Sequence, residues 1–181
     1  MKAQGATTYL EMVSLDPRRE QEAARAAIEL GVDCLLGGTH VEQVLPVLEG
    51  ATVRYFPFPG RIVGHPSVLE GTLEEIVASA VGLCEREGVA GLDLLAYRWP
   101  VDGAALARAV CAAVTKPVIV AGSIDGPTRI AEVASAAAAG FTTGTAALDG
   151  KFPGPDRGLR GQLSAILAAS EASRSLDAAA C

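Results

Sequence analysis

Lysine is scarce in this chain of 181 residues, where Lys2, Lys116 and Lys151 are the only three. A Schiff-base aldolase needs a lysine in the upper half of a strand, where its amine reaches the substrate. Lys116 precedes an apolar run and Lys151 lies in a loop beyond one, so neither position suits that chemistry. The Asp-x-Lys-x-x-Asp pattern of the monophosphate decarboxylase barrels is absent as well. The sequence therefore argues against lysine-based catalysis.

Long hydrophobic runs and clusters of basic residues are also lacking. No apolar run approaches the roughly 20 residues that a membrane span needs, and the N-terminal stretch does not have the pattern of a signal peptide. The net charge is −6, and Lys and Arg never gather over one run. A nucleic-acid surface would require such a gathering. We therefore predict neither a membrane nor a nucleic-acid partner.

The four cysteines show no C-x-x-C spacing, which is the pattern expected of metal or redox pairs. Reduced, mostly buried thiols in a cytoplasmic protein fit this usage best. Cys34 falls inside an apolar run with no basic neighbour, so we interpret it as core packing. We expect no cofactor.

Apolar runs alternate strictly with helical segments, which is typical of a parallel sheet. The expected strands cover 7–13, 32–36, 53–58, 91–97, 118–121 and 141–143. The expected helices cover 16–30, 40–50, 72–87, 102–114, 125–139 and 160–173. Start signals support these helices: Asp16 is followed by Pro17, and Thr72 with Glu75 has capping-box spacing. A further short strand can lie at 62–64, and the tail at 175–181 is expected to fray.

We predict a single domain over 1–181, an α/β fold built as a compact TIM-like (β/α) barrel with parallel strands and some units shortened. A doubly wound dinucleotide fold is the alternative, but no G-x-G-x-x-G follows the first strand. A homodimer is a candidate assembly, because six strands can close either alone or through a second copy.

The stretch 117–152 carries the strongest functional signal. Two consecutive strands both end in glycine followed by a hydroxyl residue, at Gly122-Ser123 and at Gly144-Thr145. Such turns let backbone N–H groups approach an oxyanion closely. In (β/α) barrels a phosphate commonly binds between the loops after the last two strands. We therefore predict phosphate binding at these four residues, the alternative being that the glycines only form tight turns.

Parts of the sequence resemble known phosphate-binding barrels. The run GFTTGTAALDGKF is similar to the last strand and turn of the phosphoribosyl-formimino isomerase of histidine biosynthesis. Over the whole chain, the glycerol-uptake operon antiterminator family is more similar, through Leu10-Glu11-Met12 and the stretch VTKPVIVAGSIDGPTRIAEVASAAAAG. The resemblance implies a phosphate grip at the two turns and an acidic residue at Glu11.

The isomerase resemblance also implies a second carboxylate opposite the first-strand acid, one acting as acid and one as base. The fourth expected strand ends in Tyr97-Arg98, with no acid there. Asp93 lies early in that strand, near its expected bottom. We therefore predict that this catalytic pair is not reproduced.

Residues that leave the strand ends of a barrel face a common site. They give a mixed set of acid, base and cation: Glu11, Thr39, His40, Arg61, His65, Arg98 and Ser123. Glu11 is expected to be buried and to need a partner, either Arg98 or Arg54 in an ion pair or a ligand. Arg98 can clamp an anionic group or form a salt bridge beside Trp99.

His40 and His65 are the only two histidines. Together with Glu11 they can form a His₂–carboxylate metal site, but we predict no metal. A general acid–base or substrate-binding role is the alternative that we prefer for at least one of them.

These observations predict a protein that binds a small phosphorylated metabolite, such as a sugar phosphate or triose-phosphate derivative. Proton transfer next to a carbonyl, as in an isomerase, epimerase or lyase, is the least demanding chemistry for this set. Glu11 or His40 is the expected base, Arg98 stabilises negative charge, and Thr39, Arg61 and His65 bind the substrate. A non-catalytic sensor of such a metabolite, as the antiterminator resemblance implies, is the alternative.

Overall fold

The structure is a computed structural model that describes residues 4–179. The chain divides into two compact units. Unit 1 comprises residues 1–93 and 113–117, and unit 2 comprises residues 94–112 and 118–181. The single barrel domain expected from the sequence stays a prediction.

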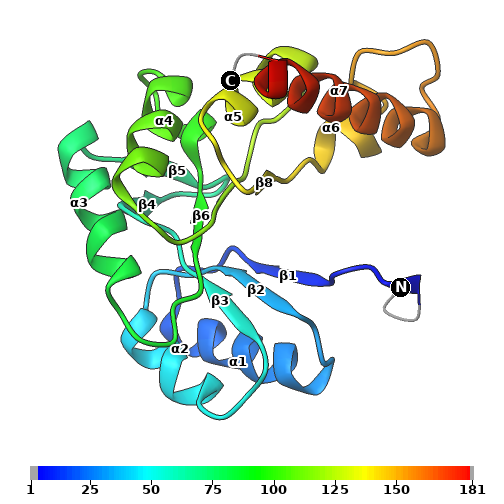
Figure 1. Ribbon diagram of the computed structural model, residues 1–181. Helices are drawn as coiled ribbons and strands as arrows, with labels where there is room; N and C mark the ends of the chain where they lie inside the picture. Colours follow the sequence, from blue (N-terminus) through cyan, green and yellow to red (C-terminus); the bar gives the residue numbers. More distant parts are fainter. Residues whose placement is uncertain (1–3, 180–181) are drawn as a thin grey trace. The chain divides into compact units, whose positions relative to one another are not determined.

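Unit 1 is built on a parallel three-stranded sheet whose strands alternate with helices along the chain (Figure 1). Leu35 lies at its centre, paired with Leu10 on one side and Tyr55 on the other. The elements are β1 (Tyr9–Met12), α1 (Pro17–Glu29), β2 (Cys34–Gly37), α2 (Val41–Leu48) and β3 (Arg54–Phe56). Beside this sheet, the N–H of Asp93 in β6 (Leu92–Leu94) donates to the Pro57 oxygen at 3.0 Å.

Small and apolar side chains fill the space between this sheet and its two helices. Ala24 and Ala27 of α1 are fully buried, so that α1 can pack closely on the sheet. Burial of apolar surface of this kind is the main stabilising term in folding. The core cluster consists of Met12, Ala24, Ala27, Leu35, Val41, Val44, Leu48, Tyr55 and Val89.

The predicted helix starts are confirmed where the sequence carries a capping signal. The Asp16 carboxylate accepts hydrogen bonds from the N–H groups of Arg18 and Arg19, and Pro17 is the first helical residue. Thr72 and Glu75 form the full capping box at the start of α3 (Leu73–Cys84). These side chains satisfy N–H groups that have no partner inside the helix.

An antiparallel hairpin interrupts the parallel pattern of unit 1. Its strands are β4 (Arg61–Val63) and β5 (Val68–Glu70). The extra strand expected at 62–64 is therefore confirmed, but its pairing partner was not foreseen. Since His65 lies in the turn between these two strands, it does not follow the end of a parallel strand.

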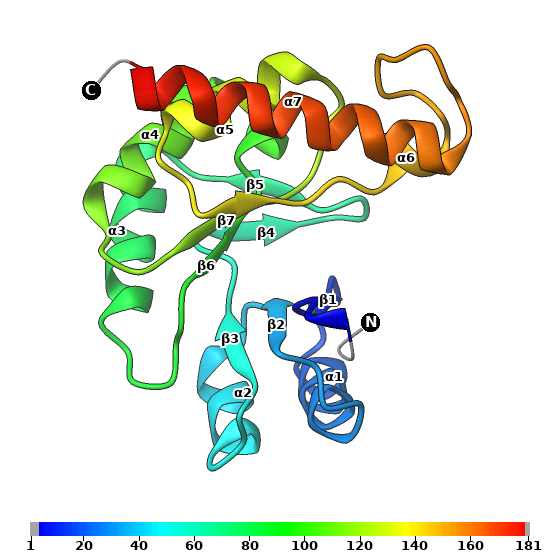
Figure 2. The ribbon, with the colours of Figure 1, turned by 45° about the vertical axis from the view of Figure 1, so that its right-hand side comes forward.

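Unit 2 contains a parallel strand pair with helices packed around it, and its longest helix, α7, lies along α5 (Figure 2). Ile119 pairs with Gly140 and Val120 with Phe141. The elements are the 3-10 turn η2 (Ala96–Arg98), α4 (Gly103–Ala113), β7 (Val118–Val120), α5 (Pro127–Ser135), β8 (Gly140–Phe141), α6 (Thr145–Leu148) and α7 (Leu159–Ala179).

Three predicted boundaries in unit 2 were wrong. The strand expected over 91–97 ends at Leu94, because the chain turns into a 3-10 helix. The helix that we expected to stop at Gly140 ends at Ser135, where Ala137 takes the left-handed conformation with φ 57°, and Gly140 lies in β8. Gly126 occupies the N-cap position before Pro127, in place of Asp125 or Thr128.

The last helix, α7, continues to Ala179, past the end expected at 173. Residues 180 and 181 lie outside the described range, and fraying of the tail stays a prediction.

The predicted α/β class with parallel strand pairing is confirmed. Among the strands that the structure describes there is no closed sheet, so closure into a barrel stays a prediction. Within the same residues, no helix has both the length and the apolar character needed to cross a membrane.

Gly38 provides a test of the packing in unit 1. An added Cβ would lie 2.4 Å from Met12 Cε and 3.0 Å from both Glu20 Oε2 and the Tyr55 hydroxyl, at a φ of +82°. We predict that Gly38→Ala lowers the free energy of unfolding by roughly 2–4 kcal/mol, the sum of backbone strain and overpacking.

Gly50→Ala is the matched control, because φ is +73° there and no atom lies within 4 Å of the added Cβ. It should cost only about 1–2 kcal/mol, the backbone term alone. Urea denaturation measures both variants. Equal losses at the two positions would contradict the close packing at Gly38.

Candidate functional site

Two carboxyl groups interact in unit 1, Glu11 of β1 and Asp93 of β6. Glu11 is exposed, so the expectation that it is buried was wrong. Asp93 is completely buried and lies at the middle of its strand, because the strand covers only Leu92–Leu94. The prediction that Asp93 lies at the strand's bottom was therefore wrong too. An acid on the first strand does have a second acid near it.

The Asp93 carboxyl has no hydrogen-bond partner for either oxygen within the described part of the chain. Burial raises the pKa of Asp93 well above the usual value of 3.8, and the charge of Glu11 raises it further. A buried carboxyl without donors is therefore held as the neutral acid. The exposed Glu11 and the buried Asp93 have different environments, which is how a pair of carboxyl groups acquires separate acid and base roles.

Arg54 does not pair with Glu11, as one of our alternatives had proposed. Its guanidinium donates to the Cys34 sulfur at 3.1 Å instead. Cys34 is buried as predicted, but it does have a basic neighbour in space. Burial outweighs the opposing charge of Arg54 and raises the pKa of the thiol. Cys34 is thus a protonated core residue, and not a reactive thiolate.

Glu20 of α1 is a fully buried acid that binds the turn after β2. Its Oε1 lies 3.0 Å from His40 Nδ1 and 3.1 Å from the Thr39 hydroxyl. The backbone N–H groups of Thr39 and His40 donate to the same carboxylate at 3.0 and 2.8 Å. His40 is the N-cap residue of α2 and offers no cap of its own. Glu20 therefore supplies from α1 the acceptor that the start of α2 lacks.

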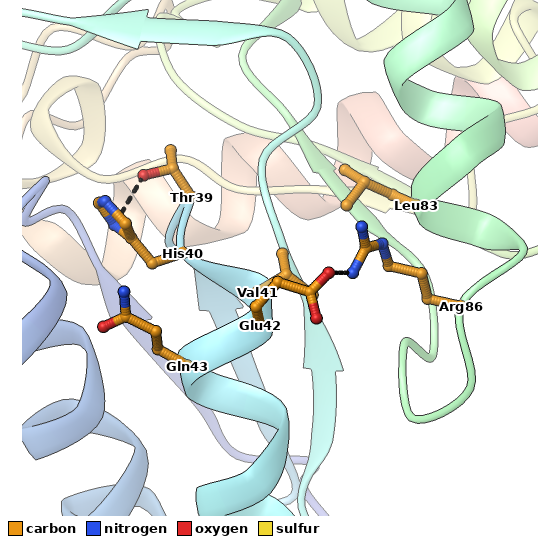
Figure 3. Close-up of a pocket in the computed structure, with 7 residues that line it drawn as sticks. All are labelled: Thr39, His40, Val41, Glu42, Gln43, Leu83 and Arg86. Atoms are coloured by element: carbon orange, nitrogen blue, oxygen red, sulfur yellow. Dashed lines mark hydrogen bonds and ion pairs between the residues drawn. The ribbon is translucent and has the colours of Figure 1, made fainter.

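A cavity of about 290 Å³ opens beside Thr39 and His40 (Figure 3). Arg86 forms an ion pair with Glu42 at its edge. The side chain of His40 is 35% exposed. The lining residues are Thr39, His40, Val41, Glu42, Gln43, Leu83 and Arg86. Thr39 and His40 are thus held by Glu20 on one side and line the cavity on the other, as residues that bind a ligand do.

Arg61 and His65 both lie on the β4–β5 hairpin. Arg61 forms an ion pair of 2.6 Å with Glu70 across the two strands, and His65 is exposed in the turn. Among the residues that the structure describes, no group of three His, Cys, Asp or Glu side chains is placed to hold a metal ion. The alternative metal site of Glu11, His40 and His65 is therefore not assembled.

In unit 2 the side chain of Arg98 packs directly on the Gly122 backbone. A Cβ added to Gly122 would lie 2.5 Å from Arg98 Nε and 3.1 Å from its Cδ. Gly122 and Ser123 have φ values of 76° and 59°, and Ser123 is one of two non-glycine residues with positive φ in the described chain. Two residues predicted for anion binding, Arg98 and Gly122, are thus brought into contact.

Arg129 of α5 holds this turn in place. Its guanidinium donates to the Ser123 carbonyl oxygen, forms an ion pair of 3.1 Å with Asp125, and lies 5.0 Å from the centre of the Tyr97 ring. The Tyr97 hydroxyl in turn donates to Glu132 at 2.7 Å. Such support can offset the strain of a serine in the left-handed region, which costs on the order of 1–3 kcal/mol.

The second predicted turn lies next to the first. Thr143 stands one residue before Gly144, and Ile124 stands one residue after Ser123. The Thr143 hydroxyl donates to the Ile124 carbonyl oxygen at 2.9 Å. Gly144 is the N-cap of the short helix α6, and Thr145 is its first residue. One hydrogen bond thus joins the residues that flank the two glycine–hydroxyl turns.

Both described lysines, Lys116 and Lys151, bind other groups of the chain. Lys116 precedes β7, and its amine donates to the carbonyl oxygens of Arg86 and Val89 at 3.1 and 2.6 Å. Lys151 is exposed and pairs with Asp149 at 2.7 Å. Lys2 lies outside the described residues. That neither Lys116 nor Lys151 serves Schiff-base chemistry stays a prediction.

Sequence reasoning missed Glu20 and Arg129 as organising residues. A signal for Glu20 was present: it stands four residues before Ala24 and seven before Ala27, on the buried stripe of α1. An acid on such a stripe requires donors nearby. Arg129 gave no comparable signal, because its partners depend on how the loop before α5 bends.

Neither a protein-family model nor a curated protein sequence matches this chain. Solved structures do resemble it. FabK from Thermotoga maritima is 18% identical with a TM-score of 0.53, over 76% of this chain and 40% of FabK.

Two further structures cover more of the chain. A putative deoxyribose-phosphate aldolase from Coccidioides immitis is 17% identical with a TM-score of 0.59, over 91% of this chain and 66% of the aldolase. The Amycolatopsis orientalis BexX/CysO complex is 17% identical with a TM-score of 0.61, over 92% of this chain and 66% of the matched one. This chain thus spans less than two thirds of the length of all three.

At these identities the likeness shows the fold alone, an α/β fold that this chain shares with these structures. It does not show the antiterminator family, and that resemblance stays a prediction.

The neutral Asp93 generates a pH-dependent prediction. Its folded-state pKa is raised, so the native state holds the proton longer than the unfolded chain does. The free energy of unfolding should therefore fall as the pH rises above about 4. The Asp93→Asn variant has no titrating group at this position. Its free energy of unfolding should therefore rise relative to that of the wild type as the pH increases. Urea denaturation at several pH values measures the difference.

Asp16→Asn is the control with the opposite sign. Backbone hydrogen bonds from Arg19 and Arg18 lower the pKa of Asp16, so its stabilising effect is present above the unfolded pKa and is lost as the pH falls. If Asp93→Asn followed the wild type in parallel at every pH, Asp93 would not be a buried neutral acid.

Proposed function

We propose that this chain binds a small phosphorylated metabolite, with the phosphate at the Gly122–Ser123 turn of unit 2. The observation that carries this proposal is the contact of the Arg98 guanidinium with the Gly122 backbone. Arginine recognises phosphate through charge-assisted and often bidentate hydrogen bonds. The absence of a Cβ at Gly122 lets the Arg98 side chain approach the main chain of the turn closely.

The turn also has donors to offer. Within the described part of the chain, no hydrogen bond takes the backbone N–H of Gly122 or of Ser123. Ser123 is exposed, and its hydroxyl is a further donor. The adjacent turn at Gly144 and Thr145 supplies a second glycine and hydroxyl, tied to the first by the Thr143–Ile124 bond. The set resembles the two-loop phosphate grip that the sequence pattern predicts.

For unit 1, taken by itself, we propose acid–base chemistry of the isomerase, epimerase or lyase kind, with Glu11 and Asp93 as the titrating pair. Glu11 is exposed and serves as the base, while the neutral Asp93 serves as the acid. The positions of Lys116 and Lys151 argue against a Schiff base. Among the neighbours in fold, the putative deoxyribose-phosphate aldolase supports the lyase reading.

The phosphate site is tested with Arg98→Met, which keeps the aliphatic stem and removes the charge. Inorganic phosphate and glycerol phosphate at millimolar concentrations should raise the melting temperature of the wild type. The variant should bind phosphate about tenfold or more weakly, because a hydrogen bond to a charged group contributes roughly 1.5–3 kcal/mol.

Arg160→Met is the matched control, since Arg160 is an exposed arginine of α7 in the same unit. It should keep the full phosphate response. A wild type with no shift at these concentrations, or an equal loss in both variants, would refute the site.

The reaction class is tested with Glu11→Gln and Asp93→Asn. A panel of triose and pentose phosphates is incubated with the wild type, and nuclear magnetic resonance follows isomerisation, epimerisation or cleavage. Each variant should lower turnover on the order of 10²–10⁴-fold while the phosphate-dependent melting shift is kept. Phosphate binding without turnover of any sugar would instead favour the non-catalytic sensor.

A further inference from the structure

Glu20 and His40 form a buried acid–imidazole pair that the proposed carboxylate chemistry does not use. Each contact of the Glu20 carboxylate is with a hydrogen-bond donor, and two of these donors are backbone N–H groups. An ionised carboxylate only accepts hydrogen bonds. His40 Nδ1, at 3.0 Å from Oε1, must therefore carry the proton in this contact.

The other ring nitrogen of His40 is left open. No partner takes Nε2 among the described residues. Nε2 is also not one of the buried unpartnered atoms there, which are the Tyr55 hydroxyl and the two Asp93 oxygens. Nε2 thus contacts solvent, and with Nδ1–H fixed it bears the lone pair that accepts a proton.

A neighbouring side chain presents the complementary group. Arg25 donates to Gln21 Oε1 at 3.3 Å, and Gln21 Nε2 donates to Gln43 Oε1 at 3.1 Å. This chain of bonds fixes the orientation of the Gln43 amide, whose remaining N–H groups are donors. Gln43 and His40 lie on the same side of the cavity (Figure 3). One acceptor and one donor together match a hydroxyl group.

The charge of the cavity also restricts its ligand. Glu42 and Arg86, the two oppositely charged residues at its edge, neutralise each other. The Glu20 carboxylate behind His40 disfavours an anion. A neutral group, such as a polyol or the hydroxyl end of a sugar, therefore fits this cavity better than a phosphate does.

We propose that Glu20 is a positioning residue which fixes His40 as an Nδ1–H imidazole, and that His40 Nε2 is a base for a hydroxyl-bearing ligand in the cavity beside α2. The ligand O–H proton moves to Nε2, and the imidazolium formed is stabilised by the Glu20 carboxylate. Return of that proton to the ligand oxygen restores both the hydroxyl group and the neutral ring. This inference does not depend on the phosphate site of unit 2.

The wild-type protein provides the first test. Long-range ¹H–¹⁵N correlation spectra report which ring nitrogen carries the proton. We expect the neutral His40 ring to be in the Nδ1–H form, while the exposed His65 shows the mixture of a free imidazole. An Nε2–H form at His40 would overturn the assignment.

Glu20→Gln provides the second test. The amide keeps the shape of the carboxylate, but its NH₂ group faces the hydrogen-bond donors of Thr39 and His40. Diethyl pyrocarbonate acylates the free imidazole nitrogen, and mass spectrometry measures its rate at each histidine. Relative to His65, the His40 rate should fall by about tenfold, the size of effect expected when an orienting partner is lost. Glu20→Asp should retain part of the wild-type acylation rate of His40. Unchanged His40 reactivity in a folded Glu20→Gln protein would overturn the positioning role.

The ligand class is tested with glycerol as the probe. A saturating shift of the His40 ring signal that is absent in Gln43→Ala and at His65 would support a hydroxyl site. A linear shift shared by both histidines would overturn it. Because phosphate binding is measured separately through Arg98, failure here and failure of the proposed phosphate site are distinguishable.

Discussion

The buried carboxylate of Glu20 is the interaction on which the arrangement of unit 1 depends. It joins α1 to the turn after β2 and supplies the acceptor for the first N–H groups of α2. Removing the donors of a buried charge typically costs about 3–5 kcal/mol. The bend at Thr39 and His40, the orientation of the His40 ring and the absence of a side chain at Gly38 are all consequences of bringing this acid close to the turn.

Asp93 shows the second way in which this interior holds a carboxyl group. It is as buried as Glu20, but no donor approaches it within the described residues. Glu20 therefore accepts hydrogen bonds from several donors, whereas desolvation stabilises Asp93 in its neutral form. A carboxylate whose oxygens all accept hydrogen bonds stabilises the structure. A buried carboxyl without such partners, beside an exposed acid, is suited to proton transfer. This contrast is why Asp93 with Glu11 carries the proposed reaction.

In unit 2, two arginines have different roles: Arg129 holds the Ser123 turn in place, and Arg98 is the residue proposed to bind phosphate. Arg129 binds the Ser123 carbonyl oxygen, Asp125 and the Tyr97 ring, so its positive charge is used within the loop. Arg98 packs on Gly122, where the absence of a Cβ leaves its guanidinium against the main chain. A turn that is fixed before a ligand arrives loses little conformational entropy on binding. Preorganisation by one arginine and recognition by another is the physical basis of the proposed phosphate site.

Features with local causes followed from the sequence alone. The capping of α1 by Asp16 and of α3 by Thr72 with Glu75, the parallel class and the two glycine–hydroxyl turns depend on neighbouring residues. Contacts between distant positions did not follow. Glu11 was expected inside and is exposed, Asp93 was dismissed and is the buried acid, and Glu20 was not considered. Burial, and with it the charge of each acid, depends on what residues 11, 20, 40 and 93 meet after folding, and sequence spacing does not contain that information.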